Sequence, residues 1–203
     1  TAQTSSGYQV IDTSVRASGN AAFHLSHPLP EDQILTLNRL LLAGSSSQLL
    51  FSSRLGYAGP AQAALAEIST DGGANWNEIW RQVGTGDEGE TSFSDRQISL
   101  AAFAGREIVL RFRYAFFQGI YYSQTARGVG FYVDDIRLTD TDELLEEQVS
   151  TASAALSFAF QPSQMTDYSL RVRAHLSQRR LPWGPAKLVT AQAGEPLPPS
   201  LTI

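Results

Sequence analysis

Strict alternation of apolar and polar residues between positions 107 and 117 is the strongest constraint on the fold. Every second position there is apolar, in the order Ile108, Leu110, Phe112, Tyr114 and Phe116. The intervening positions include Arg111 and Arg113. Because successive side chains of a β-strand point to opposite faces of a sheet, the segment predicts a strand with one face in a core and one arginine-bearing face in solvent.

Short segments of similar character recur through the first 140 residues, separated by clusters of Gly, Ser, Asp and Pro. This is the pattern of an all-β sandwich. Segment 34–42 also fits a helical stripe, but its neighbours favour a strand. The other strands predicted here are 8–15, 21–25, 49–55, 64–68, 76–83 and 131–138.

An acidic stretch at 139–148 marks a boundary, with Asp142, Glu143, Glu146 and Glu147 expected on one exposed helical turn. We therefore predict two parts, a sandwich over 1–140 and a small β extension over 141–203. The extension alternates at 156–160, 170–174 and 187–190. These segments are too few for an independent sandwich.

Composition excludes several classes of protein. The 203 residues carry 15 Lys plus Arg against 20 Asp plus Glu, a net charge of -5, which argues against nucleic-acid binding. No apolar run approaches the ~18 residues of a membrane span, so membrane insertion is not expected. The absence of cysteine excludes disulfides and cysteine-ligated metal. Because the chain starts at Thr1, it is expected to be part of a longer precursor with neighbouring domains.

The segment from Ser69 to Trp76 matches the pattern Ser-x-Asp-x-Gly-x-x-Trp. Asp71 can accept hydrogen bonds from backbone amides ahead of it, and the two glycines that follow tolerate positive φ. Trp76 is then expected to fold back over the turn. The pattern resembles the Asp box of sialidases, where it is a structural hairpin remote from the chemistry, and it occurs once here.

Three blocks, 67–76, 98–114 and 128–138, come in the order seen in MAM-like jelly rolls. The chain resembles most the bacterial variety attached to immune inhibitor A metallopeptidases. The resemblance covers roughly residues 15 to 140 and implies an all-β, two-sheet jelly-roll sandwich. It further implies a non-catalytic module of a secreted or cell-surface protein, binding a glycan or a protein.

The C-terminal segments 167–174 and 182–190 are similar to the last two strands of a fibronectin type III domain. That resemblance implies that Trp183 packs inside the extension rather than forming a sugar platform. The earlier strands of the fibronectin fold are missing from the sequence.

A loop at 118–128 follows the arginine-bearing strand and is the candidate recognition site. Aromatic rings and planar guanidinium groups suit the binding of sugars or carboxylates. In the alternative interpretation, the arginines pair with cross-strand carboxylates and the tyrosines cap the sandwich edge. The candidate ligand-binding residues are Trp80, Arg111, Arg113, Tyr121, Tyr122 and Arg127.

Adjacent Asp134 and Asp135 are candidate metal ligands. Val133 and Ile136 are three positions apart, so both can face the core only if a β-bulge separates them. A bulge can turn one carboxylate inward, where it needs a partner, and hard oxygen ligands suit Ca²⁺. Related jelly rolls often hold a structural Ca²⁺ near this strand. Asp12 and Glu67 are further candidate ligands. The alternative is an Arg or backbone amides as partner.

Catalysis finds little support in the sequence. The three histidines, His24, His27 and His175, show no His-Glu-x-x-His spacing, and there is no Gly-x-Ser-x-Gly elbow. We therefore expect no enzyme. A glycoside hydrolase on a β-sandwich, which needs only two suitably spaced carboxylates, is the first alternative. A structural spacer is the second.

Overall fold

The computed structural model describes residues 1–118, 123–144, 156–157, 167–176, 179–190 and 200–201. The chain divides into two compact units, Thr1–Leu145 and Glu146–Ile203. The last strand of the first unit runs through the acidic stretch as far as Leu144. The expectation of a helical turn is therefore wrong for Asp142 and Glu143, which pair with Leu42 and Leu41 in a sheet.

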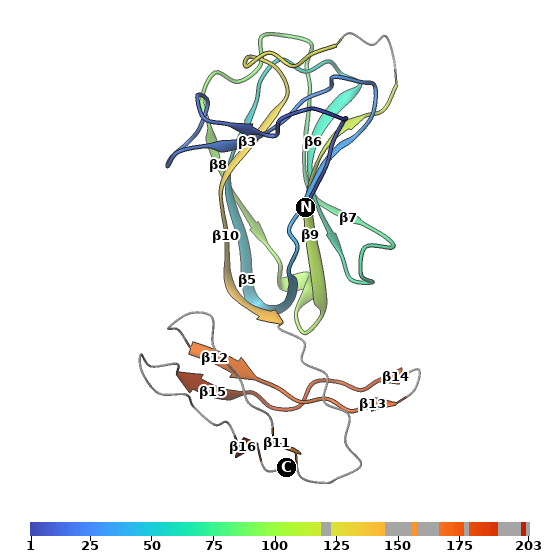
Figure 1. Cartoon of the computed structure of the whole chain (residues 1–203), viewed down its shortest axis with the longest axis vertical. Coiled ribbons are helices and arrows are strands. Elements are labelled where there is room, and N and C mark those ends of the chain that lie inside the picture. Colours follow the sequence, from blue (N-terminus) through green and yellow to red (C-terminus); the bar gives the residue numbers. More distant parts are fainter. Residues whose placement is uncertain (119–122, 145–155, 158–166, 177–178, 191–199, 202–203) are drawn as a thin grey trace. The chain divides into compact units, whose positions relative to one another are not determined.

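A ten-stranded sheet builds the first unit and curls into two facing layers (Figure 1). The layers are joined where Leu41 pairs with Ile108. The layer called here the β9 layer has the order β1 (Ala2–Gln3), β4 (Gln33–Thr36), β9 (Glu107–Phe116), β6 (Gln62–Ser69) and β7 (Asn77–Val83). The β10 layer has the order β8 (Ser94–Ser99), β5 (Leu40–Leu55), β10 (Phe131–Leu144), β3 (Ala22–Leu25) and β2 (Ile11–Asp12). One short 3₁₀ helix, η1 (Ala101–Phe103), follows β8.

The core lies between the two layers. The alternating apolar positions of β9 are buried there as predicted from Ile108 to Tyr114, and Phe116 is half-buried. Phe112 makes edge contact with Phe51 at a centroid distance of 5.1 Å and lies 6.3 Å from Phe131 of the opposite layer. Burial of this one face of each layer accounts for the period-2 pattern, and the all-β sandwich is confirmed.

Several strand predictions need correction. The segment 34–42 contains the end of β4 and the start of β5 with a break between them, and the segment 8–15 is strand only at Ile11–Asp12. Strand β8 was not predicted. Its residues alternate between half-buried and exposed. The half-buried even positions are mostly polar, because β8 is an edge strand.

The predicted turn at Ser69–Trp76 is confirmed. Asp71 Oδ1 accepts the backbone N–H of Asn75 at 2.8 Å, and Gly72 and Gly73 have φ of 74° and 99°. Trp76 Nε1 donates to Gly73 O at 3.0 Å, so its ring lies over the turn. These hydrogen bonds lower the pKa of Asp71 to about 2, with that from the Asn75 backbone as the largest cause.

The described residues of the second unit form short antiparallel pairs. Strand β12 (Asp167–Leu170) pairs with β15 (Lys187–Thr190). Two-residue strands β11 (Leu156–Ser157), β13 (His175–Leu176), β14 (Arg179–Arg180) and β16 (Ser200–Leu201) form the other pairs. The guanidinium of Arg173 lies 4.1 Å from the ring centroid of Trp183. Phe158 and Phe160, predicted in a strand, lie outside the described residues.

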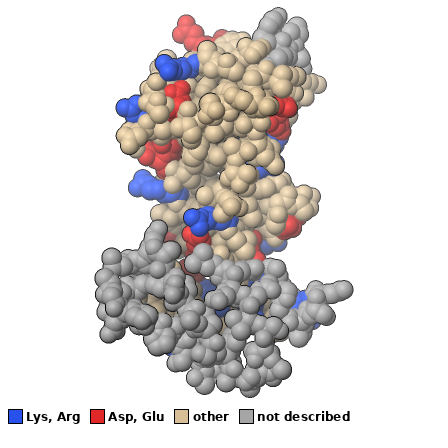
Figure 2. Space-filling view, in the orientation of Figure 1, with Lys and Arg blue, Asp and Glu red and all other residues tan. Residues whose placement is uncertain are grey.

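No helix among the described residues has the length and apolar character to cross a membrane. Among the described residues on the face shown in Figure 2, acidic and basic side chains are scattered between uncharged ones, with no broad patch of one sign.

Candidate functional site

The four predicted recognition residues that the structure describes do not gather into one site. Trp80 was predicted to join the ligand-binding residues on the outer face, but its side chain packs against the core. Its ring makes edge contact with Phe51 at 5.3 Å. A bulge explains this orientation: Ala66 pairs with Trp80 while Glu67 pairs with Glu78, so that both Ile79 and Trp80 pack against the core. Arg96 of β8 covers the ring, with its guanidinium carbon 5.5 Å from the centroid.

Arg111 and Arg113 do lie on the outer face of the β9 layer, but ion pairs hold both. Arg111 Nε donates to Glu67 Oε2 at 2.6 Å, and Arg113 Nη2 donates to Glu67 Oε1 at 2.6 Å. Arg113 also pairs with Asp32 at 2.9 Å. The Arg111 guanidinium stacks on the ring of Trp76 at 4.0 Å. This is the cross-strand pairing that formed the alternative interpretation.

The charges of Glu67, Arg111 and Arg113 are balanced within this cluster. The side chain of Glu67 is only 5% exposed. Burial by itself would raise its pKa, but the hydrogen bonds and charges of Arg113 and Arg111 outweigh burial and lower the pKa. The pairing also keeps Glu67, a candidate calcium ligand, away from Asp134 and Asp135, which lie in the other layer.

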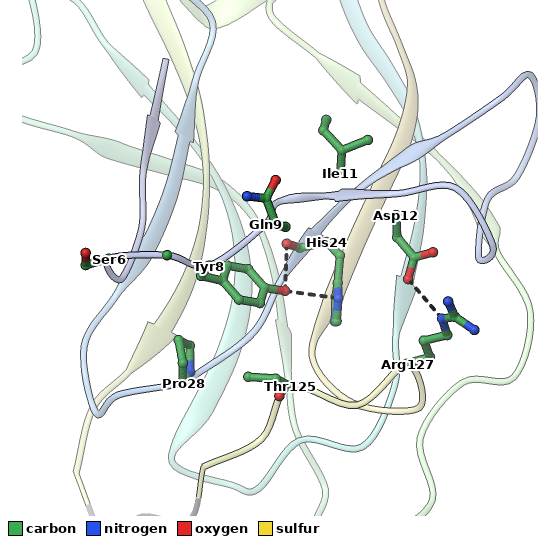
Figure 3. A pocket seen from close by; sticks show the side chains of 10 residues that line it. Ser6, Tyr8, Gln9, Ile11, Asp12, His24, Pro28, Thr125 and Arg127 are labelled. Carbon is green, nitrogen blue, oxygen red and sulfur yellow. Dashed lines mark hydrogen bonds and ion pairs between the residues drawn. The ribbon is translucent and has the colours of Figure 1, made fainter.

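Arg127 lies on the β10 layer instead, at the rim of a hollow of about 440 Å³ (Figure 3). Tyr121 and Tyr122 lie outside the described residues. The hollow is formed by the N-terminal segment, β2, β3 and the segment that precedes β10. Its lining residues are Ser6, Gly7, Tyr8, Gln9, Ile11, Asp12, His24, Pro28, Thr125 and Arg127.

Gly130 allows the Arg127 segment to approach β3. Its φ is 81°, and a Cβ there would lie 2.6 Å from the carbonyl oxygen of Leu25. A larger residue would therefore push the segment away from the strand that carries His24. Strand β10 begins directly after this glycine and places Tyr132 between His24 and Arg54 in register.

His24 forms the floor of the hollow. Its Nε2 lies 2.8 Å from Val129 O, so this nitrogen carries the proton and donates. Its Nδ1 lies 3.0 Å from the Tyr8 hydroxyl, and its ring stacks on Tyr132 with centroids 4.0 Å apart. Burial is the largest influence and lowers the pKa of His24. The imidazole is therefore a neutral support for Tyr8.

Asp12 and Arg127 supply opposite charges at the rim. Arg127 Nε lies 3.8 Å from Asp12 Oδ2, and the two side chains are 69% and 12% exposed. Burial tends to raise the pKa of Asp12, but hydrogen bonds from the Ser14 and Val15 amides and from Tyr132 lower it overall. Asp12 is thus an ionised acceptor held by these hydrogen bonds, and Arg127 is a largely exposed donor beside it.

Asp134 and Asp135 lie at the predicted bulge, which the structure confirms as a register shift between Asp134 and Arg137. Asp134 Oδ2 accepts the N–H groups of Ala17 and Ser18, and its Oδ1 accepts the N–H of Asp135. Asp135 accepts the Ser18 hydroxyl. Backbone amides thus partner Asp134, and no three acidic, His or Cys groups of the described residues could hold one ion.

Sequence reasoning missed Tyr8 and His24 as parts of a site and considered Asp12 only as a metal ligand. The three side chains line the same hollow as Arg127, although they lie more than 100 residues away from it in the chain. The spacing of residue types along the chain does not indicate that residues so far apart in sequence line one hollow.

Fold and site together define a β-sandwich module with a polar hollow on its outer surface. No family model and no curated protein matches the sequence. Among solved structures, the K2 cleaved adhesin domain of Lys-gingipain is similar, with a TM-score of 0.46, 14% identity and coverage of 68% of this chain and 88% of that one. The CBM22-2 xylan-binding domain from Paenibacillus barcinonensis Xyn10C has a TM-score of 0.41, 14% identity, and coverage of 68% and 91%.

TmCBM61, solved in complex with β-1,4-galactotriose, has a TM-score of 0.36 and 15% identity, with coverage of 61% of this chain and 73% of that one. Similarities at this level assign neither a family nor a ligand.

Proposed function

We propose that the first unit is a non-catalytic recognition module that binds a glycan in the hollow between Tyr8 and Arg127. The observation that carries this proposal is the loose pair of Asp12 and Arg127, whose polar atoms are 3.8 Å apart at the rim. Each sugar hydroxyl can both donate and accept a hydrogen bond. A fixed carboxylate beside a guanidinium therefore suits neighbouring hydroxyls, and such bonds are charge-assisted.

The rest of the lining fits a sugar ring. Ile11 is 51% exposed and, with the Tyr8 ring, offers apolar surface to the C–H groups of a sugar. Gln9, Thr125 and Ser6 are exposed and add amide and hydroxyl groups. The hollow has the size of ordinary small-ligand sites, which span roughly 300–1,000 Å³.

One feature of the hollow supports binding without turnover. Asp12 is the single carboxylate among its described lining residues. Glycoside hydrolysis in most families needs two carboxyl groups flanking the bond. The proposal accordingly includes no catalytic residue. Its other parts, a MAM-like sandwich of the bacterial type, a fibronectin-like extension and a place outside the cell or on its surface, rest on the sequence resemblance.

A glycan array with three variants tests the proposal. Arg127→Ala removes the exposed donor, and Asp12→Asn keeps Oδ1 as an acceptor for the Ser14 and Val15 amides while removing the charge. Arg39→Ala is the matched control, because Arg39 is also an exposed arginine in a side-chain ion pair, with Glu143.

We expect the wild type to bind a set of glycans, and each site variant to lose about tenfold or more of the affinity. The control should bind as the wild type does. Absence of binding by the wild type, or equal binding by Arg127→Ala, would contradict the proposal. Release of reducing ends from a bound glycan would contradict its non-catalytic part.

A further inference from the structure

A second hollow, of about 590 Å³, lies on the outer face of the β10 layer. It is bounded by the loop after β2 and by the segment that leads into β8. Its lining includes Arg16, Arg54, Ser92, Phe93, Asp95 and Asp135. Two aspartates and two arginines thus line a hollow that is otherwise lined largely by hydroxyl-bearing side chains. Arg16 donates to Gly19 O and Thr13 O, and Asp95 accepts the Ser52 hydroxyl, so protein contacts hold both side chains in place.

Tyr132 connects the two hollows. His24 of the first hollow stacks on its ring at 4.0 Å, while Arg54 of the second lies over the same ring at 5.5 Å. Phe93, also of the second hollow, makes edge contact with it at 6.2 Å. The three residues His24, Tyr132 and Arg54 are cross-strand neighbours on β3, β10 and β5. The hollows therefore open over strands two spacings apart, roughly 10 Å.

Asp12 forms the boundary between them. Its Oδ2 faces Arg127 of the first hollow. Its Oδ1 accepts the N–H groups of Ser14 and Val15, at 2.7 and 3.1 Å, and these residues line the second hollow. The Asp12 carboxylate thus holds wall residues of both hollows in place.

From this arrangement we infer that the two hollows are successive subsites for one oligosaccharide chain, which passes over the Asp12 turn. This inference rests on the proposed function and specifies its ligand: a chain of several sugar units, bound along its length, rather than a monosaccharide. Two linked binding events gain affinity because the second is intramolecular.

Calorimetric titration with β-1,4-linked gluco-, xylo- and galacto-oligosaccharides of one to six units measures the effect of chain length. For the type that the array shows to bind, we expect the tetrasaccharide to bind about tenfold or more tightly than the monosaccharide. Ser92→Trp places a bulky ring in the second hollow from an exposed position, and Ser46→Trp is the control at an exposed β5 position that lines neither hollow.

Ser92→Trp should remove the gain from chain length and keep the monosaccharide affinity, while Ser46→Trp should change neither. Equal affinity for all lengths, or an unchanged gain in Ser92→Trp, would overturn the inference while leaving the first hollow as a binding site. Two results together support the proposed function and the inference: Arg127→Ala loses all binding, and the increase of affinity with chain length disappears when Ser92→Trp fills the second hollow. Failure of every glycan to bind overturns the proposed function and the inference with it.

Discussion

Glu67 and Arg113 form a two-pronged ion pair across β6 and β9. Arg113 Nε donates to Glu67 Oε2 at 3.0 Å and Nη2 donates to Oε1 at 2.6 Å. A planar guanidinium matches a carboxylate in this geometry, which fixes both side chains. The pair joins β6 to β9 and occupies the polar atoms of Glu67 with arginine donors of the same layer.

Replacement of Glu67 tests this structural role. Glu67→Gln leaves Arg111 and Arg113 without their shared carboxylate in a largely buried position, which we expect to lower the free energy of unfolding by about 3 kcal/mol. Denaturation in urea measures the change. Glu78→Gln is the control, since its pair with Arg81 is about 40% exposed and should contribute less than about 0.5 kcal/mol. Equal effects of the two variants would contradict the role assigned to Glu67.

The turn at Asp71 should show its own titration. Hydrogen bonds in the folded state lower the pKa of this carboxyl from 3.8 to about 2. A depressed carboxyl pKa adds stability above the unfolded value, and the contribution is lost as pH falls from about 4 towards 2. Carboxyl-detected NMR titration measures the midpoint. A midpoint near 3.8 would show that the turn does not hold the carboxylate in solution.

His24 should make stability depend on pH in the same direction, but in a window nearer neutral pH. Burial, as the largest cause, lowers its pKa below 6.5, so the folded state binds the proton less readily than the unfolded chain does. Stability should therefore fall as pH is lowered from 6.5 through the folded pKa. His24→Gln, which cannot titrate, should show a smaller fall over that window in thermal melts. His27 has a lowered pKa for the same first reason, so we expect it to contribute to the fall that persists in the variant.

Asp134 separates the two interpretations of the bulge. Asp134→Asn loses an acceptor for the Ala17, Ser18 or Asp135 amide, at a cost of about 1–3 kcal/mol. If amides alone partner the carboxylate, the loss is the same in EDTA and in millimolar Ca²⁺. The calcium hypothesis predicts instead that Ca²⁺ raises the melting temperature of the wild type and that Asp135→Asn abolishes the rise. Calorimetric melts in both conditions decide between them.

The strand Glu107–Phe116 could be predicted because alternation is a local property, and the Asp71 turn because its residues lie within eight positions. Trp80 could not be oriented, since the bulge opposite Ala66 is set by the pairing of two strands. Arg127 was expected beside the face of Arg111 and Arg113, but the structure places it at the rim of the hollow on the β10 layer. Its neighbours Tyr8 and His24 come from the other end of the chain.

A crystal structure of the protein with the tightest-binding oligosaccharide tests the central claim most directly. The account predicts a sugar ring against Tyr8 and Ile11, with hydroxyls bonded to Asp12 and Arg127, and the chain continuing towards Ser92. Sugar bound instead on the outer face of the β9 layer, over Arg111 and Trp76, with the hollow beside Arg127 unoccupied, would contradict it.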